Sequence, residues 1–209
     1  QRHFVENAAH ELQTPLAVCM NKLELLSEHP DCTEDQLKEI AGLHQALNGI
    51  IRLNKSLLLL SRIDNKQFPE TRDICLNHLI HKILEGINDI YERKALHLRV
   101  SEKESLVCTM NESLATTLIT NLIKNAYVHN YEKGDIGITI SRRMLTIANT
   151  GIDKTLDKEL LFARFASQSK QQESTGLGLA IVKSIVDLYS IRIDYQYANG
   201  MHTFTLLFY

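Results

Sequence analysis

Apolar residues near the start of the chain recur at alternating spacings of four and three. The members of this series are Val5, Ala9, Leu12, Leu16, Cys19, Leu23 and Leu26. Such spacings place the apolar side chains on one stripe of a helix, the a/d seam of a coiled coil. The pattern therefore predicts one long helix that continues through Pro15 without a change of phase.

A second seamed helix follows a short break at residues 29–33 (HPDCT). Thr33 with Gln36 resembles a capping box that opens this helix. Its seam, which Asn54 interrupts, consists of Ile40, Leu43, Leu47, Ile50 and Leu57. Two such helices joined by a short loop form a hairpin. Because one hairpin cannot bury its full seam, we expect two copies to form a dimeric four-helix bundle.

From about residue 70 onward, short β-branched runs alternate with helical segments. The predicted strands are Asp73–Leu76, His97–Ser101, Leu106–Thr109, Gly137–Ser141, Leu145–Asn149, Ile191–Tyr195 and His202–Phe208. The predicted helices are Asn77–Lys94, Asn111–Val128 and Gly176–Tyr189. This mixture predicts a two-layer α/β sandwich. The whole chain is therefore expected to be α+β, with a helical domain over residues 1–65 and a sandwich over residues 70–209. The polar segment Ile152–Thr175 is predicted to be a mobile loop.

Composition narrows the classes of function. The 209 residues are 44% hydrophobic and 23% charged with a net charge of −2, which gives no reason to expect nucleic acid or an anionic membrane surface as a partner. The four cysteines lie far apart, which favours reduced thiols over a disulfide framework or a zinc site. The longest apolar run, Leu57–Leu60, is far shorter than the roughly 18 residues that a membrane helix needs. Because the chain starts at Gln1 inside a helical pattern, we expect a longer protein with an upstream segment.

His10 is the first candidate for chemistry. It follows the seam residue Ala9 and is therefore expected to point away from the core of the bundle. An exposed imidazole, with an ordinary pKa of about 6.5, is largely neutral at pH 7 and is a nucleophile. Glu11 is placed to accept the proton of the other ring nitrogen.

Pro15 raises an alternative for this segment. Thr14 could cap a helix that begins at Pro15, which would make His10 an ordinary surface residue. A proline inside a helix costs about 3 kcal/mol, and here it would distort the helix one turn beyond His10. The unbroken phase from Val5 to Leu26 favours a proline within the helix.

Asn121 and Asn125 are the second candidate pair. They are four residues apart in the run 121–129 (NLIKNAYVH), so both side-chain amides project from one face of a helix. Amide oxygens are hard ligands that Mg²⁺ accepts together with water and phosphate. The alternative is a pair of buried amides that are satisfied within the fold, or simply a pair of exposed ones.

Two segments with glycine complete the set. A predicted strand runs into Gly151, which permits the chain to turn close against a flat ligand. Gly176 and Gly178 stand at a loop-to-helix junction, where free backbone N–H groups can bind phosphate. A single Gly-x-Gly is weak evidence for a phosphate site. Four motifs in this order along one chain are much stronger evidence for a common function.

The four motifs together resemble those of the sensor histidine kinases of two-component signalling, over essentially the whole chain. Residues 10–15 (HELQTP) resemble the H box, 121–129 the N box, 149–151 the first glycine box, 161–165 the F box and 176–179 the second glycine box. The resemblance implies that His10 is the phosphoacceptor and that Asn125 holds Mg²⁺. It also implies a Bergerat-type ATP-binding domain, in which a mixed sheet packs on three helices.

The resemblance further implies the site residues, cofactors and partners. Catalytic residues on the hairpin would be His10, Glu11 and Thr14, with Thr14 assisting dephosphorylation of the partner. The residues implied to bind ATP are Asn121, Asn125, His129, Asn149, Gly151, Phe165, Lys170, Thr175, Gly176, Leu177 and Gly178. Implied cofactors are ATP and Mg²⁺, and implied partners are a second copy and a response regulator receiver domain, which Ala17 and Asn21 would contact. The expected location is the cytoplasmic portion of a bacterial inner-membrane sensor, held to the membrane through its upstream segment.

Three positions depart from the family pattern. The usual aspartate of the first glycine box is Asn149, its second glycine is Asp153, and the basic residue after the F-box aromatics is Ser167. Lys170 or Arg164 would then supply the cation for the γ-phosphate. An amide can accept from adenine or, when flipped, donate to guanine. We therefore expect ATP binding weaker by about 1 kcal/mol than in an Asn149→Asp variant, and weaker discrimination against GTP.

Two other functions compete with this prediction. ATPases of the same fold carry a glutamate four residues before the Mg²⁺ asparagine, where it activates water, whereas Asn121 cannot act as a base. This difference disfavours hydrolysis and leaves His10 as the acceptor. The other alternative is a non-catalytic dimeric scaffold with weak ATP binding, which only the three departures support.

Overall fold

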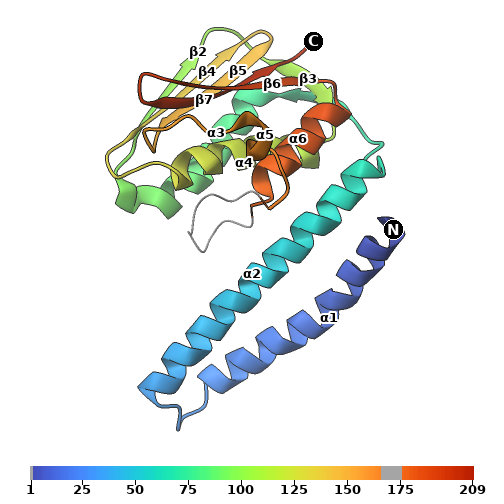
Figure 1. Cartoon of the computed structure of the whole chain (residues 1–209), viewed down its shortest axis with the longest axis vertical. Helices are drawn as coiled ribbons and strands as arrows, with labels where there is room; N and C mark the ends of the chain where they lie inside the picture. Colours follow the sequence, from blue (N-terminus) through green and yellow to red (C-terminus); the bar gives the residue numbers. More distant parts are fainter. Residues whose placement is uncertain (1, 166–175) are drawn as a thin grey trace.

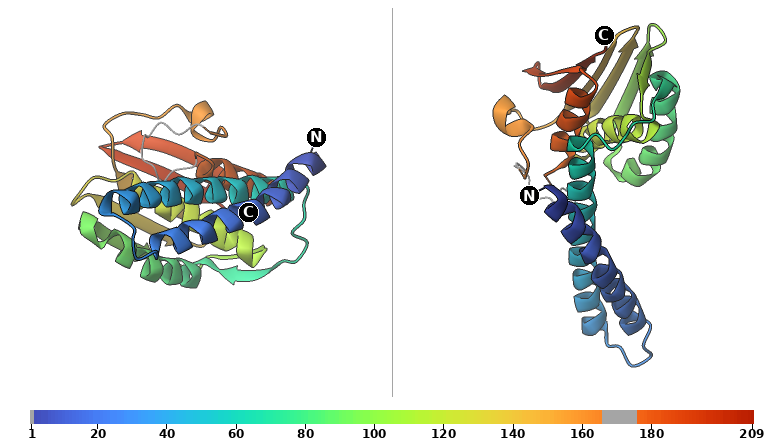
Figure 2. Two further views of the ribbon diagram at one scale, coloured as in Figure 1. Left: turned by 90° about the horizontal axis from the view of Figure 1, so that it is seen from below. Right: turned by 90° about the vertical axis from the view of Figure 1, so that its right-hand side faces the viewer.

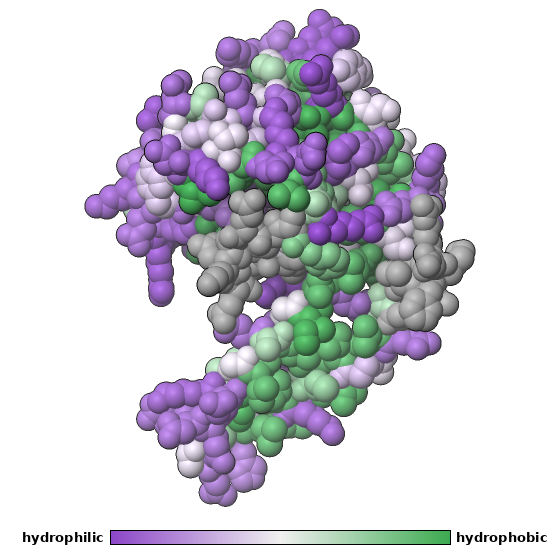
Figure 3. Space-filling model, viewed as in Figure 1, coloured by the Kyte–Doolittle hydropathy of each residue, from purple (hydrophilic) through white to green (hydrophobic). Residues whose placement is uncertain are grey.

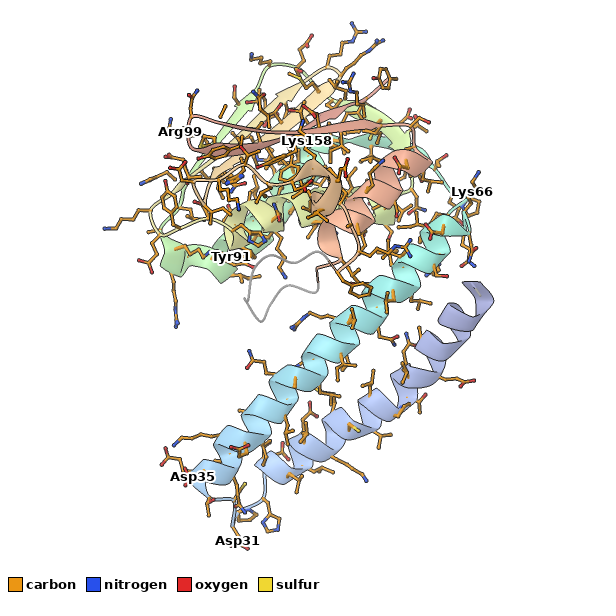
Figure 4. All side chains as sticks on the ribbon, in the orientation of Figure 1. Asp31, Asp35, Lys66, Tyr91, Arg99 and Lys158 are labelled. Atoms are coloured by element: carbon orange, nitrogen blue, oxygen red, sulfur yellow. The ribbon has the colours of Figure 1, made fainter. Side chains whose placement is uncertain are left out.

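The computed structural model describes residues 2–165 and 176–209, except for the side chains of residues 2–8, 10 and 88. Two long helices, α1 (Arg2–Ser27) and α2 (Glu34–Asp64), form an antiparallel hairpin (Figure 1). Asp31 and Asp35 mark its turn, and Lys66 lies just beyond the end of α2 (Figure 4). Pro15 lies inside α1, so the alternative in which a helix begins at this proline is wrong.

The predicted capping box opens α2. The Oγ1 of Thr33 accepts from the backbone N–H of Gln36 at 3.3 Å, and the Oε1 of Gln36 accepts from the backbone N–H of Thr33 at 2.9 Å. Glu34 and Asp35 add negative charge to the first turn, where it complements the helix dipole. A cap of this kind stabilises a helix by about 1 kcal/mol and fixes the residue at which α2 begins.

A single hairpin leaves much of its apolar seam uncovered. Leu12 on α1 is 49% exposed, and Leu43 and Ile50 on α2 are 57% and 49% exposed. Figure 3 shows apolar surface running along the hairpin. Contiguous exposed apolar surface marks an interaction site in a soluble domain. The seam is therefore available to a partner over most of its length.

The second part of the chain is built on two sheets. In the smaller sheet, β1 (Arg72–Cys75) pairs antiparallel with β3 (Val107–Met110). The larger sheet has the order β2-β4-β5-β7-β6, with β2 parallel to β4 and the other pairs antiparallel. Its strands are β2 (His97–Glu102), β4 (Asp135–Ser141), β5 (Met144–Thr150), β6 (Arg192–Ala198) and β7 (Met201–Leu207). The sheet is mixed, as the family resemblance implies.

Helices cover one face of the larger sheet (Figures 1 and 2). They are α3 (Leu76–Tyr91), followed by the 3₁₀ turn η1 (Glu92–Lys94), α4 (Glu112–Val128) and α6 (Gly178–Leu188). Alternate residues of β4, namely Ile136, Ile138 and Ile140, point into the layer between sheet and helices and are buried. This strict alternation is what a sheet with one covered face requires. The predicted α+β class is confirmed.

One part of the predicted secondary structure needs correction. The segment Ile152–Thr175 was expected to be a loop, but it contains the short helix α5 (Lys158–Leu161). Asp157 caps this helix by accepting from the backbone N–H groups of Glu159 and Leu160. A single helical turn is too short to show a 3.6-residue period, so only the capping residue could have indicated it. Residues 166–175 of the segment lie outside the described part of the chain.

The two parts of the chain touch through α2. This helix packs against α6, and the Arg164 guanidinium pairs with the Asp64 carboxylate in the last turn of α2 at 2.9 Å. Phe68 lies just beyond α2. The guanidinium of Arg62 stacks over its ring, 4.9 Å from the ring centroid. Both side chains of the ion pair are partly exposed, so the pair orients the domains more than it stabilises them. Among the described residues, no helix is both long enough and apolar enough to span a bilayer.

Candidate functional site

Helix α4 carries the first part of the site, and both of its ends are fixed. At its start, the Oδ1 of Asn111 accepts from the backbone N–H of Ser113 at 3.0 Å. At its end, the Nζ of Lys94 donates to the carbonyls of Tyr127, Val128 and Asn130 at 2.8–3.0 Å. A cation at a helix C-terminus satisfies carbonyls that the helix leaves unpaired and complements its dipole. The helix is therefore a rigid support for the side chains on its exposed face.

Asn121 and Asn125 lie on that face, but their amides differ. The Nδ2 of Asn121 donates to the Thr117 carbonyl at 2.9 Å within the helix, and its Oδ1 faces Gly178 at the start of α6. The Asn125 side chain hydrogen-bonds to no residue in the described part of the chain. The structure thus divides the pair into one amide tied to the protein and one available to a ligand.

A cavity of about 330 Å³ opens in front of both amides, where the domain faces the hairpin. From the domain it is lined by Asn121, Lys124, Asn125, Val128, His129, Gly178 and Leu179, and from α2 by Arg52, Lys55 and Ser56. The family motifs predict its asparagines, histidine and glycine. The three cations of its lining, Arg52, Lys55 and Lys124, were missed, because their spacing along the chain carries no signal. They give the cavity a positive wall suited to phosphate.

His129 lies at the mouth of this cavity, at the end of α4. Loss of hydration, and then the nearby Lys94 and His202 side chains, lower the pKa of His129 below its usual range. The ring is therefore neutral at pH 7, and a neutral imidazole can both donate and accept hydrogen bonds.

The second glycine box sits where α6 approaches α4. A Cβ on Gly178 would come within 2.9 Å of the Asn121 Oδ1, so any larger residue here would require the Asn121 amide to shift. Gly176 has a φ of +68° and accepts a hydrogen bond at 3.2 Å from the backbone N–H of Phe165, whose side chain is 59% exposed. Leu177 between the glycines is fully buried. The box thus joins the start of α6 both to α4 and to the F box.

The first glycine box forms a second wall of the candidate site, at the end of β5. Asn149 is 2% exposed, and its Nδ2 donates to the Thr150 carbonyl at 2.8 Å. Its Oδ1 is the only buried side-chain oxygen or nitrogen without a partner among the described residues. A Cβ on Gly151 would come within 3.0 Å of the His129 carbonyl, so this wall adjoins the end of α4. An unpaired buried acceptor costs about 1–3 kcal/mol, so this oxygen is a candidate to accept a hydrogen bond from a ligand.

A hydrogen-bond cluster behind this wall was not predicted. The Oγ1 of Thr150 donates to the Asn130 Oδ1 at 2.6 Å and accepts from the backbone N–H of Asp135 at 2.9 Å. A Cβ on Gly134 would lie only 2.0 Å from the Asn130 Oδ1. The cluster holds the end of β5 against the end of α4. Of its residues only Thr150 belongs to a predicted motif, so their sequence positions gave no sign that they meet.

The remaining predicted site residues lie on α1 or among residues 166–175, which the structure does not describe. His10 is part of α1, and on the same helix Glu11 and Thr14 are exposed. Lys170 and Thr175 lie outside the described residues. Arg164, proposed as a cation for the γ-phosphate, is instead paired with Asp64. The part of the chain that the structure describes holds no cluster of three or more His, Cys, Asp or Glu side chains suited to a metal. A metal at this site would therefore need oxygens from a ligand beside that of Asn125.

A helical hairpin followed by this domain is the architecture of the histidine kinases. The phosphoacceptor domain family His Kinase A matches residues 1–66, and the histidine kinase-, DNA gyrase B- and HSP90-like ATPase family matches residues 110–208. The chain therefore belongs to the sensor histidine kinases of two-component signalling, with a phosphoacceptor domain followed by a domain of the histidine kinase-like ATPase family.

Among known proteins, the chain is similar to heme sensor proteins of staphylococci. It is 34% identical over 218 residues to heme sensor protein HssS of Staphylococcus saprophyticus and 33% identical over 215 residues to that of Staphylococcus aureus strain Newman. The alignments cover 100% and 99% of this chain but 46% of each relative, so the chain spans about half the length of these relatives.

Solved structures share the fold at low sequence identity. Full-length ShkA in complex with AMPPNP matches 100% of this chain and 47% of its own, with a TM-score of 0.76 and 16% identity. Histidine kinase AdeS of Acinetobacter baumannii matches 94% of this chain and 95% of its own, with a TM-score of 0.66 and 21% identity.

Proposed function

We propose that this chain phosphorylates its own His10 from Mg²⁺·ATP and passes the phosphoryl group to an aspartate of a response regulator receiver domain. The observation that carries the proposal is the buried, unpartnered Oδ1 of Asn149. A fully buried acceptor is tolerated where a ligand supplies the donor, and the exocyclic amino group of adenine is such a donor. The neighbouring Gly151 has no side chain, so the end of β5 lies close against the His129 carbonyl and the His202 ring.

The triphosphate is proposed to extend from this wall into the cavity beside α4 and α6. The cavity is lined by the cations Arg52, Lys55 and Lys124 and adjoins the first turn of α6. Helix N-termini and cationic walls both favour phosphate. The free amide oxygen of Asn125 fits a hard cation whose other ligands are phosphate and water. Bound there, Mg²⁺ would neutralise charge on the phosphate oxygens during transfer.

The proposed reaction moves one phosphoryl group in two steps. A ring nitrogen of His10 attacks the γ-phosphorus in line, the bond to the β,γ-bridging oxygen breaks, and ADP leaves with that oxygen. The proton on the other ring nitrogen passes to Glu11. A carboxylate oxygen of the receiver aspartate then attacks the same phosphorus, the N–P bond to His10 breaks, and the ring regains its proton from Glu11.

The hairpin is proposed to act as a homodimer. The uncovered seam residues Leu12, Leu43 and Ile50 are each about half exposed in one chain, and a second hairpin packed against them would complete a four-helix bundle. Thr14, Ala17 and Asn21 are exposed, and their spacing places them on the face of α1 to which position 10 also belongs. That face supports the proposed docking of a receiver domain.

We also propose that the chain is the cytoplasmic half of a membrane sensor. The relatives are named heme sensor proteins, and this chain corresponds to about half of their length. A membrane attachment through an upstream segment is consistent with that ratio.

Transfer of radiolabel from γ-labelled ATP tests the proposal. The chain should incorporate label that is stable in base and labile in acid, and should lose it to a purified receiver domain whose aspartate is intact. Chains without label, although folded and able to bind ATP, would indicate the non-catalytic scaffold instead.

Replacing Thr14 tests the proposed phosphatase activity. Thr14 is exposed one turn after His10, where its hydroxyl could orient a water toward a docked phospho-aspartate. Thr14→Ala should label itself at the rate of the natural chain but dephosphorylate its regulator at least about tenfold more slowly. Both rates are measured with the same labelled regulator. An equal loss of both activities would show that Thr14 supports the helix and does not orient the hydrolytic water.

A second substitution tests the choice of base. Because the Nδ2 of Asn149 already donates to the Thr150 carbonyl, its Oδ1 faces the ligand as an acceptor. This contact favours adenine, whereas the sequence alone left donation to guanine equally open. We expect the natural chain to prefer ATP over GTP. Asn149→Leu should lose about 1 kcal/mol of ATP affinity, roughly fivefold, and most of that preference.

Competition titrations of ATP and GTP measure both quantities. An Asn149→Asp variant serves as the comparison: it gains charge toward the amino group but turns a second oxygen toward the Thr150 carbonyl. Its advantage in ATP affinity should therefore fall below the about 1 kcal/mol expected from the sequence. If the natural chain bound GTP as tightly as ATP, the amide orientation would not govern the choice of base.

A further inference from the structure

The one polar residue in the seam of α2 contacts the helix that carries the phosphoacceptor. Asn54 interrupts the apolar seam and is 6% exposed. Its Nδ2 donates to the backbone carbonyl of Ala9 at 2.7 Å, and Ala9 is 3% exposed. We propose that Asn54 is a positioning residue, which fixes the turn of α1 that contains His10. This inference rests on the proposed function of His10.

The energetics argue that this amide has a specific role. An asparagine in an apolar seam lowers stability relative to leucine, and its buried polar atoms must be hydrogen-bonded to limit the cost. The seam asparagine of a coiled coil commonly pairs with its counterpart on another helix and sets the register. Here the amide donates to a main-chain carbonyl, which ties α2 to one particular peptide unit of α1. That unit immediately precedes His10.

Pro15 explains why this turn of α1 needs a hydrogen bond from another helix. A proline has no N–H, so the Glu11 carbonyl, four residues before Pro15, lacks its usual donor within the helix. The helix backbone on the C-terminal side of His10 therefore has one hydrogen bond fewer than a regular helix. The hydrogen bond from Asn54 holds the backbone on the N-terminal side, at Ala9. An in-line attack tolerates little misplacement of the nucleophile, and a shift of about 1 Å can cost on the order of 100-fold in rate.

The first test replaces the amide by an apolar side chain of similar size. Asn54→Leu should label itself at least about tenfold more slowly than the natural chain, while its ATP affinity is unchanged and its Tm is equal or higher. Amide exchange at residues 9–14 should become faster. The matched control is Asn48→Leu on the same helix, whose amide contacts the His44 ring and not α1. The control should keep the natural rate.

A second variant separates positioning from stability. Asn54→Asp has the shape of asparagine but no donor once its carboxylate is ionised, so at a pH high enough to ionise it the variant should have a lower Tm, whereas the Tm of the leucine variant is equal or higher. Labelling should be slow in both variants, because both lack the donor. If the rate instead follows Tm, with leucine as active as the natural chain, Asn54 serves stability or register and the inference is wrong. If the natural chain itself takes up no label, the proposed function fails, and the amide exchange of Asn54→Leu still tests the tie to α1.

Discussion

A His10→Gln variant should take up no acid-labile phosphate from ATP, while the natural chain is labelled. Glutamine has a good helix propensity, so the variant should keep α1, into which residue 10 falls. Its amide is not a nucleophile toward phosphorus, because its nitrogen lone pair is delocalised into the carbonyl. The expected loss is therefore complete, whereas dimerisation and nucleotide affinity should be those of the natural chain. Label uptake, sedimentation and a binding titration measure the three properties.

The matched control for this variant is His29→Gln. His29 lies between the two helices of the hairpin, beside Asp31, and has no part in the proposed site. Its substitution should leave labelling unchanged. Label that persisted in His10→Gln at the natural level would identify another of the nine histidines as the acceptor and overturn the proposed function.

The sequence predicted the elements of this fold well because their signals are local. In both hairpin helices the seam residues lie three or four positions apart. The cap at Thr33 requires only Gln36, three positions further on. The seven strands and three long helices of the second domain each occur within a few residues of their predicted bounds. Only α5 escaped notice, since one turn has no period.

The tertiary partners of the site residues could not be predicted in this way. The cavity beside Asn125 is lined partly by Arg52 and Lys55, which lie some seventy positions earlier and on a different domain. The pairing of Arg164 with Asp64 spans 100 positions. Such contacts depend on how α2 packs against α6, and the charge of a surface residue does not reveal its partner.

Asn149 shows a further limit of sequence reasoning. Its type departs from the aspartate typical of the family, and an amide that is free to flip would weaken the choice of base. The direction of the amide is fixed by the Thr150 carbonyl, which is a backbone group and carries no sequence signal. The structure thus restores an acceptor at a position where the residue type alone left donor and acceptor equally open.

Replacing Asn125 should weaken nucleotide binding in the presence of Mg²⁺ and barely change it in chelator. The Asn125 amide hydrogen-bonds to nothing in the described part of the chain, so its removal breaks no contact of the protein. Alanine also improves helix propensity at this position in α4. What Asn125→Ala removes is one oxygen ligand of the proposed metal. The affinity for Mg²⁺·ATP should therefore fall at least about tenfold, or roughly 1.4 kcal/mol.

Asn121→Ala provides the contrast, because it lies four residues away on the same face of α4. Its amide is tied to the Thr117 carbonyl and packs against Gly178, so it supports the shape of the site without offering a free oxygen. Its substitution should lower affinity by a similar factor with Mg²⁺ and with chelator. The measured quantity is the nucleotide affinity with Mg²⁺ divided by the affinity with chelator. This ratio should fall in Asn125→Ala and keep the value of the natural chain in Asn121→Ala. Equal ratios in both variants would make Asn125 a structural amide and leave Mg²⁺ to be held by the phosphates and water alone.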